Sequence, residues 1–131
     1  MVDKDKYKIL IIDDDEFLLD MYSMKFSELG TFSVKIALSA VEALEKIKGG
    51  LDSDVVLVDL VMPNMDGFEF LNQVKTGKLL KKSKIIVLSN LGQKSDIERS
   101  MELGADDYII KAYFTPTEVT RKVQALLLKK K

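Results

Sequence analysis

The sequence predicts an α/β fold, a doubly wound parallel sheet of five strands with helices on both faces. Short apolar runs rich in β-branched residues alternate with longer segments of helical periodicity, and this alternation continues along the 131 residues. The runs are apolar at successive positions, as in parallel strands that are covered on both faces. No linker, low-complexity tract or change of composition interrupts the pattern, so we expect one domain over residues 1–131.

The first three repeats carry start and stop signals for their helices. After a strand over residues 7–12, either Asp14 or Asp15 is expected to cap a helix. After a strand over 32–37, Ser39 and Glu42 form a capping box, and Gly49 ends the helix that follows. After a strand over 54–59, Asp66 is expected to cap the third helix. The apolar residues of the first helix are assigned to the core: Phe17, Leu18, Met21, Tyr22 and Leu29.

The last two repeats complete the sheet. The fourth strand is expected over 84–89, followed by a helix that begins near Ser95 and closes at Leu103 and Gly104. The fifth strand is expected over 107–110, and Thr115 and Pro116 supply an N-cap and a first-turn proline for the last helix. Because crossovers between parallel strands are right-handed, five such repeats favour the flavodoxin-like strand order 2-1-3-4-5.

The composition excludes several kinds of chemistry. The chain has no Cys and no His, so it offers no thiolate, disulfide, imidazole base or His-ligated metal. Its formal charge of -1 gives no basic footprint for direct contact with nucleic acid. The apolar run over 9–12 is too short for a signal peptide or a membrane span, so we expect a cytoplasmic protein without membrane contact. The three lysines at 129–131 are interpreted as a solvated helix end.

Polar side chains follow the predicted strands at the points where the strands end. In open α/β sheets the functional crevice lies at the carboxyl ends of the strands. Asp13 and Asp14 follow the first strand, Asp59 ends the third, Ser89 the fourth, and Lys111 follows the fifth. Since the first, third and fourth strands are neighbours in the expected order, their acids should converge.

Converging carboxylates need a cation. At about 4 Å, two carboxylates repel by about 4 kcal/mol at an effective dielectric near 20, unless one is protonated or a cation lies between them. A pocket of oxygen ligands with room for water suits Mg²⁺. A single Asp after a strand is more often a helix cap, and a lone Ser89 or Lys111 is equally unremarkable. The four strand ends taken together favour a site.

Four motifs resemble the receiver domain of two-component response regulators, and the resemblance spans essentially the whole chain. They are Ile-Ile-Asp-Asp-Asp-Glu at 11–16, Val-Asp-Leu-Val-Met-Pro-Asn-Met-Asp-Gly at 58–67, Val-Leu-Ser-Asn at 87–90 and Gly-Ala-Asp-Asp-Tyr-Ile-Ile-Lys at 104–111. The resemblance implies a phosphorelay module, not an enzyme acting on separate substrates, and only self-phosphorylation and autophosphatase chemistry are expected.

The resemblance also implies a role for each strand end. Asp59 would accept a phosphoryl group from a phosphohistidine on a sensor histidine kinase or phosphotransfer protein. The family pattern makes Asp14, Asp59 and the backbone carbonyl of Val61 ligands of Mg²⁺, with Asp13 holding the metal through water. Lys111 would offset charge on the phosphoryl oxygens, and Ser89 would bond one of those oxygens in the product.

A switch is implied as well. In the family, the hydroxyl residue and an aromatic residue couple phosphorylation to the face formed by the fourth helix, fifth strand and fifth helix. Ser89 and Tyr108 take these places here, although a tyrosine in a strand is otherwise ordinary packing. The expected output is a downstream protein partner or an output domain missing from this chain. The resemblance also leaves open a phosphorylation-dependent homodimer, with Asp107 and Arg121 paired across this face.

Some positions depart from the family pattern. Ala112 stands where most receivers have a cis proline, and a cis bond before a residue other than proline costs about 2.5 to 4 kcal/mol. The Lys111–Ala112 bond is therefore either trans with a re-routed loop, or a source of strain. Asn90 replaces a small residue, and Val61 and Leu91 are apolar where relatives often carry groups that position water. We therefore expect a long-lived aspartyl phosphate.

Three other functions compete with this interpretation, and two of them remain open from the sequence. Asp13-x-Asp15 suggests a Mg²⁺-dependent phosphohydrolase of the haloacid dehalogenase type with Asp13 as nucleophile, although Phe17 departs from its motif. A flavodoxin shares the fold, but successive aspartates would repel its flavin phosphate. A receiver-like scaffold that binds partners without being phosphorylated is the third, and Asn90 and Ala112 keep it open.

Overall fold

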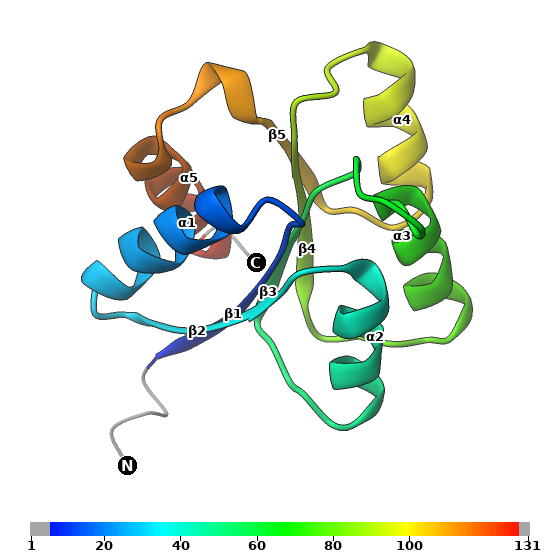
Figure 1. Ribbon diagram of the computed structural model, residues 1–131, viewed down its shortest axis with the longest axis horizontal. Coiled ribbons are helices and arrows are strands. Elements are labelled where there is room, and N and C mark those ends of the chain that lie inside the picture. Colours follow the sequence, from blue (N-terminus) through cyan, green and yellow to red (C-terminus); the bar gives the residue numbers. More distant parts are fainter. Residues whose placement is uncertain (1–5, 129–131) are drawn as a thin grey trace.

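The computed structural model describes residues 6–128, in which five parallel strands form one sheet between two layers of helices (Figure 1). The strand order is β2-β1-β3-β4-β5, so the predicted topology is confirmed. The strands are β1 (Tyr7–Ile12), β2 (Phe32–Ala37), β3 (Val55–Val58), β4 (Lys84–Ser89) and β5 (Asp107–Ile110).

The register of the sheet brings the carboxyl ends of the central strands to one edge. Ile12 of β1 pairs with Val58 of β3, and Val58 pairs with Val87 of β4. Ser89 at the end of β4 pairs with Ile110 at the end of β5. The third strand is shorter than the expected 54–59, and the acidic residues at both of its ends lie outside it. The residues that follow β1, β3 and β5 therefore share one rim of the sheet.

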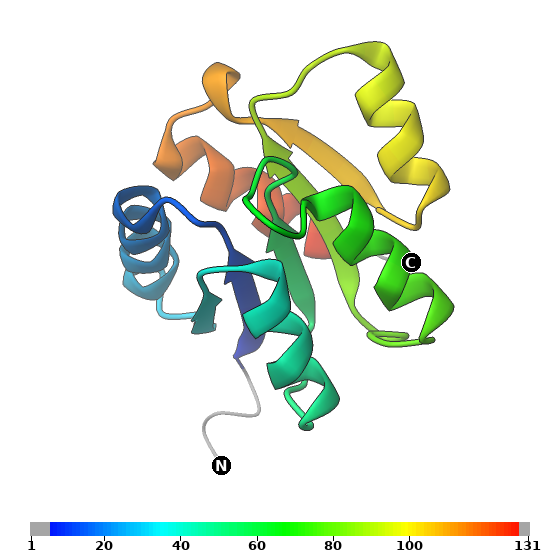
Figure 2. The ribbon, with the colours of Figure 1, turned by 45° about the vertical axis from the view of Figure 1, so that its right-hand side comes forward.

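Helices cover both faces, as Figures 1 and 2 show. The helices α1 and α5 lie on one face, and α2, α3 and α4 lie on the other. Successive residues of β1 alternate between the two cores: Ile9 packs with Phe26 of α1 and Val123 of α5, whereas Leu10 packs with Leu71 of α3. This explains the uninterrupted apolar runs. The helices are α1 (Glu16–Glu28), α2 (Ala40–Lys48), α3 (Gly67–Thr76), α4 (Lys94–Glu102) and α5 (Pro116–Leu128).

The expected caps are present at four helix starts. Asp15 caps α1, Asp66 caps α3, and the Thr115 hydroxyl accepts a hydrogen bond from the Glu118 backbone N–H at 3.1 Å. Ser39 caps α2, but the Glu42 carboxylate accepts from the Leu38 N–H at 2.8 Å and not from Ser39. This hydrogen bond holds the pKa of Glu42 below its ordinary value.

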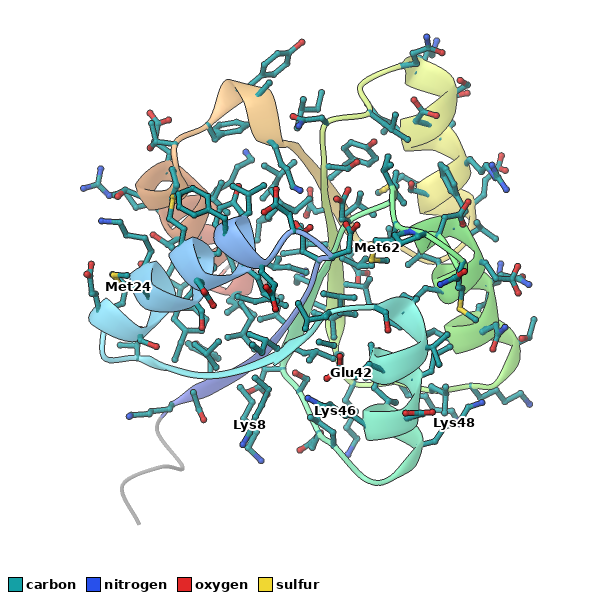
Figure 3. All side chains as sticks on the ribbon, viewed as in Figure 1. Lys8, Met24, Glu42, Lys46, Lys48 and Met62 are labelled. Carbon is teal, nitrogen blue, oxygen red and sulfur yellow. The ribbon has the colours of Figure 1, made fainter. Side chains whose placement is uncertain are left out.

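Glu42 also meets a lysine one turn further along α2. The Glu42 carboxylate lies 3.1 Å from the Lys46 ammonium, and the labelled side chains can be followed in Figure 3. Lys46 in addition donates to the carbonyl of Ile36 in the edge strand β2 at 2.8 Å. Lys46 thus connects α2 to the sheet, whereas an ion pair between two side chains of one helix stabilises only that helix.

The assignment of the first helix to the core was wrong in part. Phe17 is 72% exposed and Leu29 is 38% exposed. The inward face of α1 consists of Leu19, Tyr22 and Phe26, which follow helical spacing. Phe17 lies in the first turn directly after the Asp15 cap, where the helix faces the open rim of the sheet.

The Lys111–Ala112 bond is trans, because residues 6–128 contain no cis peptide bond. The chain instead forms a short 3₁₀ helix over Lys111–Tyr113 before it enters α5. Of the two outcomes expected for this bond, the re-routed loop is the one observed. None of the helices in the described residues is long and apolar enough to cross a membrane, and the basic end at 129–131 lies outside the described part of the chain.

Candidate functional site

Three successive aspartates after β1 have three different environments. The backbone N–H of Asp13 extends the sheet by donating to the Ala37 carbonyl at 3.2 Å, and the residue is 2% exposed. Asp14 is exposed at the rim. The Asp15 carboxylate accepts from the N–H groups of Phe17 and Leu18 and so starts α1. The turn therefore buries one carboxylate, exposes the next and uses the third as a cap.

Asp59 occupies the corresponding place after β3. Its backbone N–H donates to the Ile12 carbonyl at 3.1 Å, which fixes the residue to the end of β1. Its Oδ1 accepts from the backbone N–H of Leu60 at 2.7 Å and of Val61 at 3.3 Å. Asp59 is a buried residue, only 7% exposed. Asp59 is thus held by the two peptide groups that follow it.

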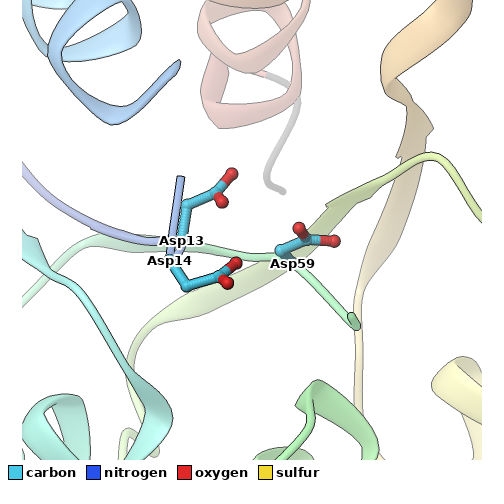
Figure 4. A group of neighbouring side chains, drawn as sticks. All are labelled: Asp13, Asp14 and Asp59. Carbon is cyan, nitrogen blue, oxygen red and sulfur yellow. The ribbon is translucent and has the colours of Figure 1, made fainter. Parts of the chain in front are cut away.

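The carboxylates of Asp13, Asp14 and Asp59 form one cluster at this rim (Figure 4). One oxygen of each lies within 4.8 Å of the others. At such distances each pair repels by roughly 3 to 4 kcal/mol at an effective dielectric near 20. The predicted convergence of the strand ends is therefore observed, and the cluster needs a compensating cation.

Lys111 supplies part of that compensation. Its ammonium lies 2.8 Å from Asp13 Oδ2 and 3.1 Å from Asp59 Oδ2, and its side chain is 8% exposed. Burial alone would lower the pKa of Lys111, but the hydrogen bond to Asp13 and the charges of Asp59 and Asp13 outweigh it and raise that pKa. For Asp13, burial outweighs the neighbouring ammonium, so the pKa of this carboxyl is raised.

The remaining charge suits a hard divalent cation. Three carboxylates and one ammonium leave a formal charge of -2. The donors are oxygens only, and the exposed Asp14 leaves the cluster open to water. Oxygen ligands with retained water are the coordination that Mg²⁺ prefers. The residues present therefore fit the metal that the sequence predicts.

Ser89 and Tyr108 share a partner, Leu91, in the segment that follows β4. Ser89 is 0% exposed, and its Oγ accepts from the Leu91 N–H at 3.3 Å. The Tyr108 hydroxyl donates to the Leu91 carbonyl at 2.5 Å. Burial, with the charges of Asp96 and Asp59, raises the pKa of Tyr108 to about 12. This role of Leu91 could not be predicted from its side chain, because Leu91 acts through its backbone alone.

Two of the divergent positions, Asn90 and Ala112, line a hollow beside Lys111. Asn90, Lys111 and Ala112 line this space of about 340 Å³ together with apolar residues of α1 and the start of α5. Val61 follows Asp59 at the rim and is 58% exposed. Asn90 and Ala112 therefore lie beside Lys111, and Val61 is open to solvent.

Asp14→Asn is expected to stabilise the metal-free protein by about 1 kcal/mol, within the range of favourable single substitutions. Among the described residues the Asp14 carboxylate accepts no hydrogen bond, and it lies in a cluster of like charge, so the change removes repulsion only. The same change should weaken Mg²⁺ binding at least tenfold. Urea unfolding and Mg²⁺ titration check both effects; Asp20→Asn, on the exposed side of α1, is the control. A destabilised Asp14→Asn would contradict this account.

The chain matches known proteins along most of its length. A family model described as the response regulator receiver domain matches residues 9–124. Chemotaxis protein CheY1 of Helicobacter pylori (strain ATCC 700392 / 26695) is 30% identical over 120 residues, which cover 92% of this chain and 96% of that protein. The transcriptional regulatory protein ResD of Bacillus subtilis is 35% identical over 122 residues, 92% of this chain and 48% of ResD.

A solved structure agrees with these matches. The crystal structure of a CheY-like response regulator receiver domain protein from Methanospirillum hungatei has a TM-score of 0.83 at 29% identity, and 95% of each chain is covered. The strand order, the acidic cluster at the carboxyl rim and the match over 9–124 lead to one conclusion. The chain belongs to the family of response regulator receiver domains, the receiving modules of two-component signalling.

Proposed function

We propose that this chain accepts a phosphoryl group on Asp59 and transmits its phosphorylation state through the face formed by α4, β5 and α5. The observation that carries the proposal is the contact of one buried ammonium, Lys111, with both Asp13 and Asp59 at the carboxyl rim. This arrangement puts a cation and two further carboxylates, one of them exposed, beside Asp59, the proposed nucleophile. Family membership adds the precedent of phosphorelay signalling.

The chemistry is a transfer between two proteins. An oxygen of Asp59 attacks the phosphorus of a phosphohistidine, the P–N bond breaks, and the imidazole leaves and takes up a proton. Because the 131 residues contain no His, the donor belongs to a sensor histidine kinase or phosphotransfer protein. Oδ2 of Asp59 faces Lys111, so attack by this oxygen brings the phosphoryl group next to the ammonium.

Mg²⁺ is the proposed cofactor. Asp14, Asp59 and the backbone carbonyl of Val61 would hold it directly, and Asp13 would hold it through water. When bound, the metal supplies positive charge to the phosphoryl oxygens. Lys111 orients the transferred group from its own side and remains protonated, since its pKa is raised. Asp13, with both carboxylate oxygens engaged, fixes Lys111 in place.

The deeper burial of Asp13 favours this proposal over a phosphohydrolase with Asp13 as nucleophile. Asp13 Oδ1 accepts from the Asp15 N–H at 3.0 Å, Oδ2 accepts from Lys111, and the residue is 2% exposed. Both oxygens of Asp59 are engaged as well, but Asp59 is the more exposed of the two residues, at 7%. The greater exposure favours Asp59 as the nucleophile that a phosphoryl donor reaches.

Ser89 and Tyr108 are the proposed switch. Both bond to Leu91, one through its N–H and the other through its carbonyl. When the Ser89 hydroxyl turns to a phosphoryl oxygen, the Leu91 N–H loses its acceptor, and the loop held by Tyr108 must adjust. The change reaches the output face, where a downstream protein, a further domain or a second phosphorylated copy would read it. Asp107 and Arg121 would pair across such a homodimer.

The test is to map the phosphorylated residue. The chain is incubated with acetyl phosphate and Mg²⁺, the acyl phosphate is reduced with borohydride, and the modified peptide is identified by mass spectrometry. Modification of Asp59 that requires Mg²⁺ supports the proposal. Modification of Asp13 would identify the hydrolase-type nucleophile, and no modification with either acetyl phosphate or a histidine kinase would indicate a scaffold that is not phosphorylated.

Val61→Asn is expected to shorten the lifetime of the aspartyl phosphate about tenfold, which corresponds to 1.4 kcal/mol of activation free energy. Hydrolysis needs a water positioned opposite the Asp59 oxygen, and the apolar Val61 side chain at the rim cannot orient one. The backbone carbonyl of residue 61 is retained. Loss of ³²P label after removal of the donor measures the lifetime. Val41→Asn on α2, also exposed, is the control, and a short lifetime in the wild-type chain would overturn the prediction.

A further inference from the structure

The first residue of α3 touches the backbone of the candidate phosphoacceptor. A Cβ atom placed on Gly67 would lie 2.4 Å from the carbonyl oxygen of Asp59 and 2.7 Å from the Cα of Leu60. Real Cβ atoms essentially never come so near backbone atoms. Among the seven glycines of the chain this is the shortest such approach.

The need for glycine here comes from proximity and not from backbone conformation. Positive φ angles are found at Gly30, Gly50 and Gly104, whose added Cβ atoms would meet nothing within 4 Å. Gly67 is absent from that group and is buried. An alanine at this position therefore has an allowed backbone but no space for its methyl group.

Both sides of the contact are held in place. On the α3 side, the Asp66 carboxylate accepts from the Glu69 N–H at 2.9 Å, and the buried Phe70 anchors the helix in the core. The Gly67 N–H itself donates to the Leu60 carbonyl at 3.0 Å. On the other side, the Asp59 N–H is bonded to β1. An added methyl group would have to displace one of two ordered segments.

The displaced segment is the one that holds the Asp59 carboxylate. The N–H groups of Leu60 and Val61 bond to Asp59 Oδ1, and Oδ2 meets Lys111 at 3.1 Å. The start of α3 contacts the backbone of Asp59 and Leu60 through Gly67. A shift of these peptide groups by a few tenths of an ångström changes both contacts of the carboxylate.

We propose that Gly67 is a positioning residue: by carrying no side chain, it allows the start of α3 to support the Asp59–Leu60 backbone and thereby sets where the Asp59 carboxylate lies relative to Lys111 and the other acids. The inference rests on the proposed function of Asp59. It makes the first turn of α3 part of the phosphoryl site, although Gly67 contacts neither a metal nor a phosphoryl group.

The test compares Gly67→Ala with Val74→Ala in the same helix. Val74 is 4% exposed and belongs to the α3 side of the core, so its truncation lowers stability without touching Asp59. Amide NMR of the metal-free proteins and Mg²⁺ titration are measured at a temperature where both variants are folded. Gly67→Ala is expected to shift the amide signals of residues 59–61 and to weaken Mg²⁺ binding about tenfold, whereas Val74→Ala should stay within twofold of wild type.

A second pair of variants loosens the same turn without adding an atom. Asp66→Ala removes the cap of α3, and Asp66→Asn keeps a capping side chain while removing the same charge. Asp66→Ala is expected to bind Mg²⁺ about threefold more weakly than Asp66→Asn. This comparison decides the question if Gly67→Ala does not fold.

The outcomes separate this inference from the proposed function. Wild-type amide shifts at 59–61 and unchanged Mg²⁺ affinity in Gly67→Ala would reduce Gly67 to a packing residue, as would equal affinities of the two Asp66 variants if Gly67→Ala does not fold. Absence of phosphorylation of the wild-type chain would instead refute the proposed function, while the amide shifts, which need neither metal nor phosphoryl group, would still report on the placement of Asp59.

Discussion

Asp59→Asn is expected to abolish Mg²⁺-dependent labelling by acetyl phosphate, with a loss of at least about 1000-fold, because an amide oxygen is a far weaker nucleophile than a carboxylate. The fold should tolerate the change. An Asn Oδ1 can still accept the N–H groups of Leu60 and Val61, and the substitution removes one charge from a repulsive cluster. The measurement is the initial rate of incorporation of ³²P, with the unfolding transition recorded on the same preparation.

Asp54→Asn is the matched control, because Asp54 lies just before β3 and its carboxylate accepts the Lys8 N–H at 2.7 Å at the opposite edge of the sheet. Its labelling should equal that of wild type. Equal labelling of Asp59→Asn and wild type would refute the assignment of the site. Label that moves to Asp13 in Asp59→Asn would show that the buried acid can react once its neighbour is neutral.

The order of the strands and the acidic rim could be predicted because they depend on local features. A run such as Val55–Val58 is buried at each position, which only a strand between two helical layers explains. The caps at Asp15, Asp66 and Thr115 need a single side chain and the N–H groups that follow it. Since parallel strands end on one rim, the convergence of Asp13 and Asp59 follows from the topology.

Features that depend on packing between distant segments could not be predicted. The exposure of Phe17 follows from where α1 begins relative to the rim, which helical periodicity does not specify. The common contact of Ser89 and Tyr108 with Leu91 uses backbone atoms. The close approach of Gly67 to Asp59 depends on how α3 is seated. These contacts determine the geometry of the site more finely than the choice of side chains does.

Lys111→Met is expected to slow phosphorylation by acetyl phosphate at least 100-fold while leaving Mg²⁺ binding as strong as in wild type or stronger. In the metal-free protein the ammonium occupies the space between Asp13 and Asp59, so a metal bound to these acids has to compete with it. Methionine fills a similar volume without charge. Removal of the competing cation favours the metal, whereas loss of the charge beside Asp59 Oδ2 removes stabilisation of the transferred phosphoryl group, worth about 2.7 kcal/mol or more for one such donor.

The stability of Lys111→Met should depend on pH and on Mg²⁺. Without the ammonium, two buried carboxylates lack a cationic partner. The loss lowers the free energy of unfolding by about 3 kcal/mol at neutral pH, the lower end of the range for breaking a buried ion pair. The pKa of Asp13 is already raised above 3.8 by burial, and the loss of Lys111 raises it further. A folded-state pKa above the unfolded value means that stability falls as pH rises from about 4 through the folded-state pKa. This fall in stability with rising pH should be larger in Lys111→Met than in wild type.

Unfolding measured from pH 4 to pH 8, with and without Mg²⁺, separates the two roles of Lys111. At neutral pH, Mg²⁺ should raise the free energy of unfolding of Lys111→Met more than that of wild type, because binding to the native state alone adds stability in proportion to RT ln(1 + [Mg²⁺]/Kd). Lys94→Met removes an exposed ammonium that lies 3.9 Å from Glu98, and it should behave as wild type throughout. A variant that binds Mg²⁺ more weakly than wild type would show that Lys111 organises the acids for the metal, and the competition described above would then be wrong.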